Sequence, residues 1–162
     1  MLHWLSLRVM KLLMVCLGNI CRSPLAEGIL RERAKQAGLS WTIDSAGTTG
    51  HAPGMQPHAL SQKVAALHGI DIGNQRCRQF TKDDISRFDH IYAMDEENYR
   101  DIRRISGSNW DESKVSLLMD EVYPNRHTGI PDPWYGGEPG YHEVFEMIDL
   151  ACEKIIERLG SR

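Results

Sequence analysis

A cysteine and an arginine six positions apart are the first residues in the chain that could do chemistry. Cys16 and Arg22 enclose a loop that contains Gly18 and Asn19, within the stretch VCLGNICRSP of residues 15–24. Glycine and asparagine tolerate positive φ angles best. A loop that closes into a helix directs successive backbone N–H groups inward, and the helix adds the positive end of its dipole. The stretch therefore predicts a concave site for a tetrahedral oxyanion.

Three side chains give this predicted site a reactive character. Cys16 would face the centre of the positive field, which stabilises a thiolate, the nucleophilic form of cysteine. Arg22 supplies a planar fork that can hold two phosphoryl oxygens. Ser23 can donate a hydrogen bond to the sulfur and steady it as a leaving group. In a plainer interpretation, Cys16 is a buried small residue and Arg22 a surface charge. That interpretation does not explain why glycine, asparagine, serine and proline occur at the positions around them.

Other loop motifs lack essential residues in this chain. A nucleotide-binding P-loop requires a second glycine and a lysine, and a dinucleotide fingerprint requires three glycines, whereas Gly18 stands alone. A zinc site is disfavoured because Cys16 and Cys21 have no second pair of cysteines or histidines at ligand spacing. We therefore expect no metal and no cofactor.

The segments around the loop alternate between apolar runs and helical patterns. The expected strands are residues 8–15, 41–45, 90–94 and 115–119, and the expected helices are residues 23–38, 57–68, 96–105 and 141–159, with a brief helix that begins at 81–84. This alternation predicts a parallel sheet in which ligands bind beyond the carboxyl ends of the strands. The Cys16 loop follows the first strand directly and so occupies that position. A second segment, residues 120–140, is rich in proline and glycine and aperiodic, which is typical of functional loops.

The composition predicts one globular domain at residues 9–160 behind an N-terminal extension at residues 1–8. The chain has 162 residues and a formal net charge of −3, and its basic residues are scattered among acidic ones, so no nucleic-acid surface is expected. The apolar stretch at 9–17 contains Lys11 and is too short to span a membrane, and residues 1–7 lack the charge pattern of a secretory signal. Four cysteines do not make a disulfide framework, so we expect free thiols and a cytoplasmic protein.

Two motifs together resemble a known family. VCLGNICRSP at residues 15–24, combined with DPWY at residues 132–135, is similar to the low molecular weight protein tyrosine phosphatases. Supporting stretches lie at 44–48, 68–70 and 93–95, so the resemblance spans about residues 8–159. It implies an α/β fold of the flavodoxin-like type, a three-layer sandwich. Its four-stranded parallel sheet would have the order 2-1-3-4, with helices on both faces.

The resemblance also implies a mechanism. Cys16 would attack phosphorus to form a phosphocysteine intermediate, Arg22 would bind the phosphoryl group, and Asp132 would protonate the leaving phenolate and then activate water. Expelling an aryloxide does require a proton donor, although an Asp-Pro dipeptide alone is a common turn. Trp134 and Tyr135 would wall a pocket that admits the aromatic ring of a phosphotyrosine-containing protein, and the enzyme would act as a monomer or weak dimer.

Further residues take roles from the same resemblance. Cys21 would be a redox guard that forms a reversible disulfide with the nucleophile, the alternative being simple packing beneath the loop. Gln75 stands where many relatives have a histidine that supports the loop, and His51, where relatives often carry an aromatic residue, is either a solvated histidine or a substrate contact. The phosphate-binding residues would be Leu17, Gly18, Asn19, Ile20, Cys21 and Ser23, and the loop would be supported by Ser45 and Gln75.

Three other functions remain as alternatives. A thioredoxin-linked arsenate reductase has a similar loop but needs a later pair of cysteines, and residues 78–151 contain none. A phosphoarginine phosphatase of the same superfamily tends to have threonine where Ile20 stands, and the apolar Ile20 favours a phenyl phosphate. A non-catalytic phosphate-binding module would not need Cys16 together with Asp132.

Overall fold

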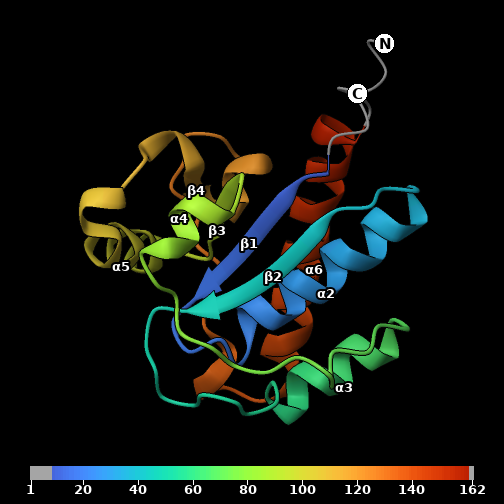
Figure 1. Ribbon diagram of the computed structural model, residues 1–162. Helices are drawn as coiled ribbons and strands as arrows, with labels where there is room; N and C mark the ends of the chain where they lie inside the picture. The colour runs from blue at the N-terminus through green and yellow to red at the C-terminus, as the bar shows by residue number, and fades with distance from the viewer. Residues whose placement is uncertain (1–8, 161–162) are drawn as a thin grey trace.

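The computed structural model describes residues 9–160, so the predicted extension at residues 1–8 lies outside the described residues. The four strands are β1 (Lys11–Cys16), β2 (Thr42–Gly47), β3 (His90–Ala93) and β4 (Val115–Leu117). All pairs are parallel, and the order across the sheet is β2-β1-β3-β4 (Figure 1). The expected sheet and its order are confirmed.

Helices cover both faces of the sheet. The α-helices are α2 (Arg22–Gln36), α3 (Ala59–Leu67), α4 (Asp83–Arg87), α5 (Glu96–Ser106) and α6 (Glu138–Leu159). The short 3-10 helices are η1 (Gly107–Asn109), η2 (Glu112–Lys114), η3 (Leu118–Glu121) and η4 (Pro133–Tyr135). Figure 1 shows α2 and α6 on one side of the sheet and α4 and α5 on the other. The architecture is therefore a three-layer sandwich.

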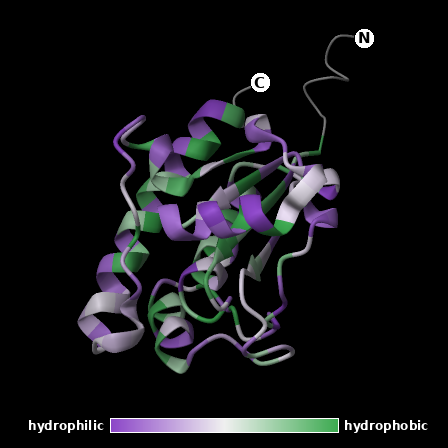
Figure 2. Ribbon diagram, turned by 90° about the vertical axis from the view of Figure 1, so that its left-hand side faces the viewer, coloured by the Kyte–Doolittle hydropathy of each residue, from purple (hydrophilic) through white to green (hydrophobic). Residues whose placement is uncertain are grey.

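Strand β1 explains why both faces must be covered. Leu12 and Met14 belong to the apolar cluster under α2 and α6, whereas Leu13 and Val15 belong to the cluster under α4 and α5. All four side chains are fully buried. A strand with apolar residues on both faces is typical of a central strand in a parallel sheet. Figure 2, viewed from the side of α5, shows hydrophilic residues on the outer helices and hydrophobic residues on the strands behind them.

Most element boundaries differ from the sequence-based expectations by one to three residues, and two of the differences have a clear physical reason. The last strand ends at Leu117, because residues 118–121 turn into a 3-10 helix in which the Val122 amide donates to the Met119 carbonyl. The final helix begins at Glu138, earlier than expected, because Pro139 occupies its first turn, where a missing amide proton costs nothing. The connection at 120–140 accordingly contains ordered helical turns at both ends and at residues 133–135.

The parallel sheet brings the ends of distant strands to one edge. The first strand ends at Cys16 and the third at Ala93, and both run in the same direction. Residues that follow these strands therefore gather at the carboxyl ends of the sheet.

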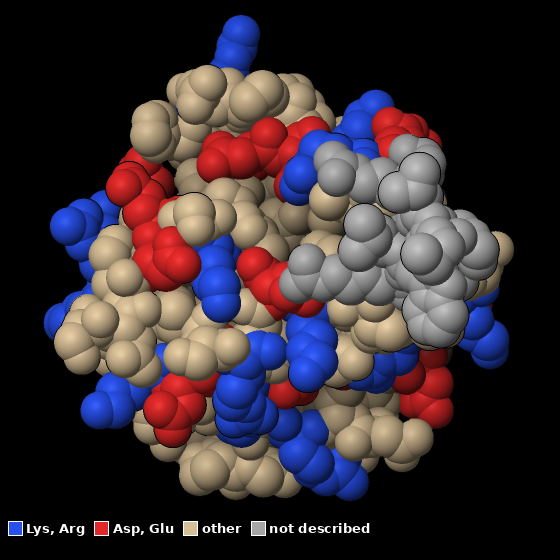
Figure 3. Space-filling view, turned by 45° about the horizontal axis from the view of Figure 1, so that its top comes forward, with Lys and Arg blue, Asp and Glu red and all other residues tan. Residues whose placement is uncertain are grey.

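Figure 3 shows the opposite end of the molecule, where lysine and arginine lie among aspartate and glutamate. Within residues 9–160, no helix is long and apolar enough to cross a membrane.

Candidate active site

The loop between β1 and α2 curls around the sulfur of Cys16. Cys16 is 2% exposed, and its Sγ accepts a hydrogen bond from the Asn19 amide at 3.2 Å. The Ser23 hydroxyl lies 3.1 Å from the same sulfur. Asn19 has a φ of 57°, the left-handed conformation that turns its amide inward. The Asn19 amide and the Ser23 hydroxyl therefore both lie within hydrogen-bonding distance of the sulfur.

The Asn19 side chain locks this conformation through buried hydrogen bonds. Its Nδ2 donates to Ser23 Oγ at 2.8 Å and to Ser45 Oγ at 2.9 Å. Its Oδ1 accepts from the backbone amide of Arg78 at 2.9 Å. The second strand approaches so closely that a Cβ at Gly47 would lie 2.8 Å from the Asn19 nitrogen, which requires glycine there. Asn19, Ser23 and Ser45 therefore form one buried network around the loop.

Glu27 ends this network, and sequence reasoning missed it. Ser45 Oγ donates to Glu27 Oε1 at 2.7 Å, and Arg31 pairs with Glu27 Oε2 at 2.6 Å. Burial raises the pKa of Glu27, while the Ser45 hydroxyl and the Arg31 charge oppose that shift. Gln75, the predicted support, donates to the carbonyl of Pro24, the last residue of the 15–24 motif, at 3.1 Å, and its Oε1 is buried without a hydrogen-bond partner. Gln75 thus contacts the first turn of α2, and Glu27 accepts a hydrogen bond from the Ser45 hydroxyl.

Arg22 is held rigidly for a side chain of its length. It is 2% exposed, and its NH1 donates to Asp95 Oδ2 at 2.6 Å and to the carbonyl of Ile130 at 2.9 Å. Burial by itself lowers the pKa of Arg22, but its interactions with Cys16 and Asp95 raise it on balance. Asp95 also caps α5, because its Oδ1 accepts from the Asn98 amide at 2.8 Å. The sequence analysis did not identify Asp95, but its position directly after the expected strand at residues 90–94 could have indicated a residue of the site.

Asp132 reaches the same point from a loop more than a hundred residues away. Its Oδ2 lies 3.7 Å from Arg22 NH2, and its side chain is about one-third exposed. Its Oδ1 accepts from the Trp134 amide at 3.1 Å, which orders the turn that follows. Cys16, Arg22 and Asp132 are therefore brought together by the end of β1, the start of α2 and the loop before η4.

These three residues lie in one cavity of about 790 Å³. Its lining includes the predicted phosphate-binding residues Leu17, Gly18, Ile20 and Cys21, the predicted walls Trp134 and Tyr135, and His51. Residues not anticipated from the sequence also line it, namely Ala52, Met55, Gln56, Pro57, His58, Ala59 and Gln62. The cavity therefore combines a charged, hydrogen-bonding floor with mainly apolar and aromatic walls.

His58 fixes one wall of the cavity. Its Nδ1 accepts from the Leu60 amide at 3.0 Å and caps α3, and its own amide donates to the Ile20 carbonyl at 2.9 Å. Its ring meets Trp134 edge-on with 5.3 Å between centroids and stacks on Tyr141, also at 5.3 Å. One side chain thus connects the phosphate loop, the start of α3 and the aromatic wall. No spacing pattern in the sequence indicated this role.

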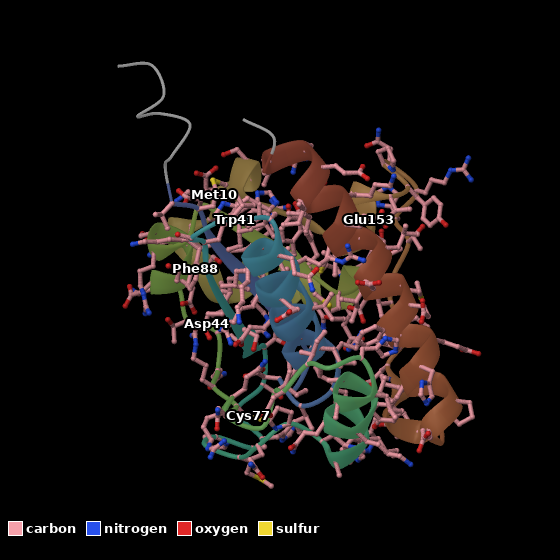
Figure 4. The ribbon with its side chains drawn as sticks, turned by 90° about the vertical axis from the view of Figure 1, so that its right-hand side faces the viewer. Met10, Trp41, Asp44, Cys77, Phe88 and Glu153 are labelled. Atoms are coloured by element: carbon pink, nitrogen blue, oxygen red, sulfur yellow. The ribbon has the colours of Figure 1, made fainter. Side chains whose placement is uncertain are left out.

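The four cysteines are free thiols with different surroundings. Cys21 Sγ lies 3.4 Å from the Tyr141 hydroxyl, and burial raises its pKa to about 11. Cys77 donates to the Asn19 carbonyl at 2.9 Å, so this thiol supports the phosphate loop from outside it. Figure 4 places Cys77 among the loops at one end of the molecule, far from Met10 and Trp41 at the other. Burial also raises the pKa of Cys152, which lies in the core.

Comparison with known proteins identifies the family. The model of the family "Low molecular weight phosphotyrosine protein phosphatase" matches residues 11–162. The chain belongs to this family. The family member from Gallus gallus, a low molecular weight phosphotyrosine protein phosphatase, is 39% identical over 93% of this chain and 96% of its own length. The crystal structure of YfkJ from Bacillus subtilis superposes with a TM-score of 0.87 at 35% identity, covering 95% of this chain and 96% of that one. A Drosophila arginine phosphatase has a TM-score of 0.84 at 32% identity, covering 92% and 97%.

Proposed function

We propose that this member of the family hydrolyses phosphotyrosine in proteins through a phosphocysteine intermediate. One observation carries the proposal: a sulfur in contact with the Asn19 amide and the Ser23 hydroxyl, a buried arginine and a carboxyl group converge in a single aromatic-walled cavity. Each of these groups has a place in a two-step displacement at phosphorus. The similarity to named tyrosine phosphatases supports the same reaction.

In the first step, the Cys16 thiolate attacks phosphorus and the bond to the phenolic oxygen breaks. The Arg22 guanidinium, oriented by Asp95, holds two phosphoryl oxygens as they become trigonal. Backbone amides of the loop stabilise the same charge. The Asp132 carboxyl group donates its proton to the departing phenolate, so tyrosine leaves as the neutral phenol.

In the second step, water attacks the phosphocysteine and the S–P bond breaks. The Asp132 carboxylate accepts the proton of that water, which restores the acid for the next turnover. The Ser23 hydroxyl, 3.1 Å from the sulfur, stabilises the returning thiolate. Inorganic phosphate then leaves the loop.

The walls of the cavity favour a phenyl phosphate over the alternatives. Ile20 lines the cavity with Trp134 and Tyr135, so the group next to phosphorus meets an apolar surface. A phosphoarginine side chain would place a guanidinium against that surface and leave its donors without acceptors. The likeness to the Drosophila arginine phosphatase makes phosphoarginine the substrate to compare in the assay.

Two variants test the mechanism. Cys16→Ser should abolish hydrolysis of phosphotyrosine, because a serine hydroxyl is not ionised at neutral pH. Asp132→Asn should lower kcat on phosphotyrosine by about a hundredfold or more, and lower it less on an aryl phosphate with a good leaving group. Asp83→Asn, an equal charge change on exposed α4, is the control. Activity retained in Cys16→Ser, or equal losses on both esters in Asp132→Asn, would show that these roles are assigned wrongly.

We also propose that Cys21 protects the nucleophile. A peroxide would oxidise the Cys16 thiolate to a sulfenic acid, and the Cys21 thiol would attack that sulfur, release water and leave a disulfide that a dithiol reduces. The raised pKa of Cys21 keeps most of it a thiol at neutral pH, so it does not compete as the nucleophile at phosphorus, and its small thiolate fraction is what attacks the sulfenic acid. Cys21→Ser should then recover less activity than wild type after peroxide and dithiol treatment. Equal recovery would exclude the protective disulfide.

We further propose a cytoplasmic enzyme that acts as a monomer or weak dimer without nucleic acid. The four free thiols support a reducing compartment. Interspersed charges on the face in Figure 3 support the absence of a nucleic-acid surface. Light scattering across a range of protein concentrations measures the oligomeric state.

A further inference from the structure

The mouth of the cavity has few charged side chains. Among residues 9–160, the cavity lining contains two histidines, His51 and His58, and no Lys, Arg, Asp or Glu besides Arg22 and Asp132, which both belong to the proposed catalytic machinery. Just beyond the lining, Lys63 and Glu138 pair with each other at 2.7 Å, so neither presents an uncompensated charge. A substrate segment on either side of the phosphorylated residue therefore meets a rim without a fixed charge of its own.

Large apolar side chains are exposed at this mouth. Trp134 is 51% exposed, Tyr135 is 91% exposed, and Met55 is 61% exposed, and all three line the cavity. They come from two separate loops, one before α3 and one before α6. Exposed apolar residues that cluster beside a cavity are typical of a binding surface, whereas scattered ones need no explanation.

The backbone of Met55 is held in place although its side chain is exposed. Its carbonyl accepts from the Cys77 amide at 2.8 Å, and its amide donates to the Ala52 carbonyl at 3.2 Å. The neighbouring Gly54 amide donates to the Cys77 carbonyl at 2.8 Å. Cys77 also supports the phosphate loop through Asn19, so Met55 sits at a fixed distance from the phosphate site. A partner that touches Met55 meets a pre-ordered contact and loses little additional freedom on binding.

We propose that Met55 and Tyr135 form a docking surface for uncharged, apolar residues adjacent to the phosphotyrosine of the substrate protein. This inference rests on the proposed phosphatase function and names the substrate class of that site. Two observations indicate what binds there. The surface is contiguous with the catalytic cavity, so it contacts residues next to the phosphotyrosine, and it offers apolar area but no partner for acidic or basic residues at those positions. Tyrosine sites flanked by leucine, methionine or phenylalanine are the preferred substrates.

Matched phosphotyrosine peptides test this preference. We would measure kcat/KM for a peptide with leucine on both sides of the phosphotyrosine and for one with aspartate there, and compare their ratio. The ratio should exceed one in the wild-type protein. Met55→Lys should lower it by about fivefold to twentyfold, because the lysine removes apolar contact area and attracts the acidic peptide. Met55→Leu should keep the wild-type ratio.

Leu67→Lys is the matched control. Leu67 is 64% exposed and lies at the end of α3, outside the cavity lining, and its substitution changes the net charge by the same amount. Its ratio should stay at the wild-type value. An equal shift in Met55→Lys and Leu67→Lys would show long-range attraction rather than docking and would overturn the proposal.

Two further outcomes would also overturn it. If light scattering shows that Met55→Lys dissociates a wild-type dimer while the peptide ratio stays constant, a second copy of the chain covers the surface. A wild-type ratio near or below one, with normal hydrolysis of free phosphotyrosine, would reject the docking surface and leave the proposed function intact. Absence of hydrolysis of every phosphotyrosine substrate would instead reject the proposed function itself.

Discussion

Replacing Asn19 with alanine tests whether side-chain hydrogen bonds hold the phosphate loop in shape. The substitution removes two donated bonds, to Ser23 and Ser45, and leaves the Arg78 amide without its acceptor. It also places alanine at a φ of 57°, where a Cβ is disfavoured. Asn125 offers a matched control because it is exposed and has a φ of 64°. Comparing the two variants separates the free-energy cost of placing alanine at a positive φ from the cost of losing the hydrogen-bond network.

The expected magnitudes follow from the number of buried bonds. Each intramolecular hydrogen bond contributes about 1 kcal/mol net, and an amide left unpaired adds about 1–3 kcal/mol. Alanine in the left-handed region costs about 1 kcal/mol in both variants. We therefore expect the free energy of unfolding to fall by about 4–6 kcal/mol in Asn19→Ala and by about 1 kcal/mol in Asn125→Ala. Domains are stable by about 5–15 kcal/mol, so the variant stays folded if the wild-type protein lies in the upper part of that range.

Urea unfolding at neutral pH measures both changes, and steady-state hydrolysis of an aryl phosphate measures the effect on the site. In Asn19→Ala, the Asn19 amide and Ser23 lose their fixed orientation toward the Cys16 sulfur, so kcat should fall about tenfold to a hundredfold. Asn125→Ala should keep the wild-type kcat. A loss of stability in Asn19→Ala no greater than that in Asn125→Ala would refute the conclusion that the network shapes the loop.

Two more predictions concern Asp95 and His90. Asp95→Asn keeps the cap on α5 but removes the charge that orients Arg22. Steady-state kinetics should show a fall in kcat of about tenfold, and calorimetry should show little change in melting temperature. An unchanged kcat would mean that Ile130 alone orients the arginine. Burial lowers the pKa of His90 from 6.5 to about 4, so the unfolded chain binds the extra proton between these values. Stability should therefore fall by about 3 kcal/mol as the pH drops from 6.5 to 4. Denaturant unfolding at pH 7 and pH 4.5 should show a smaller difference in His90→Gln; an equal difference would exclude His90 as the cause.

The phosphate loop was predictable because its information is local. Cys16, Asn19, Arg22 and Ser23 lie within eight consecutive residues between a buried strand and a helix start, so their spacing alone implies a nest with a thiol at its centre. The strand order and Asp132 were reached through the family resemblance, since neither follows from periodicity. The sheet order is confirmed, and the roles of Cys16, Arg22 and Asp132 stay predictions for the kinetic tests.

Other parts of the site depend on contacts between distant segments. Asp95 reaches Arg22 because β1 and β3 are neighbours and end at the same edge. Glu27 accepts a hydrogen bond from the Ser45 hydroxyl because α2 packs against β2, and Gln75 donates to the Pro24 carbonyl from a segment about fifty residues away. His58 meets Trp134 only because two loops fold over one cavity.

The sequence by itself determined how a cysteine and an arginine are placed around a tight turn at the start of a helix, because residues close in the chain are constrained by backbone geometry. Only the tertiary structure decided how that turn is supported and what surrounds it. The buried partners of Arg22 and Ser45, and the uncharged mouth at Met55, arise from strand order and loop packing. Such contacts join residues tens of positions apart, and no local pattern encodes which of them meet.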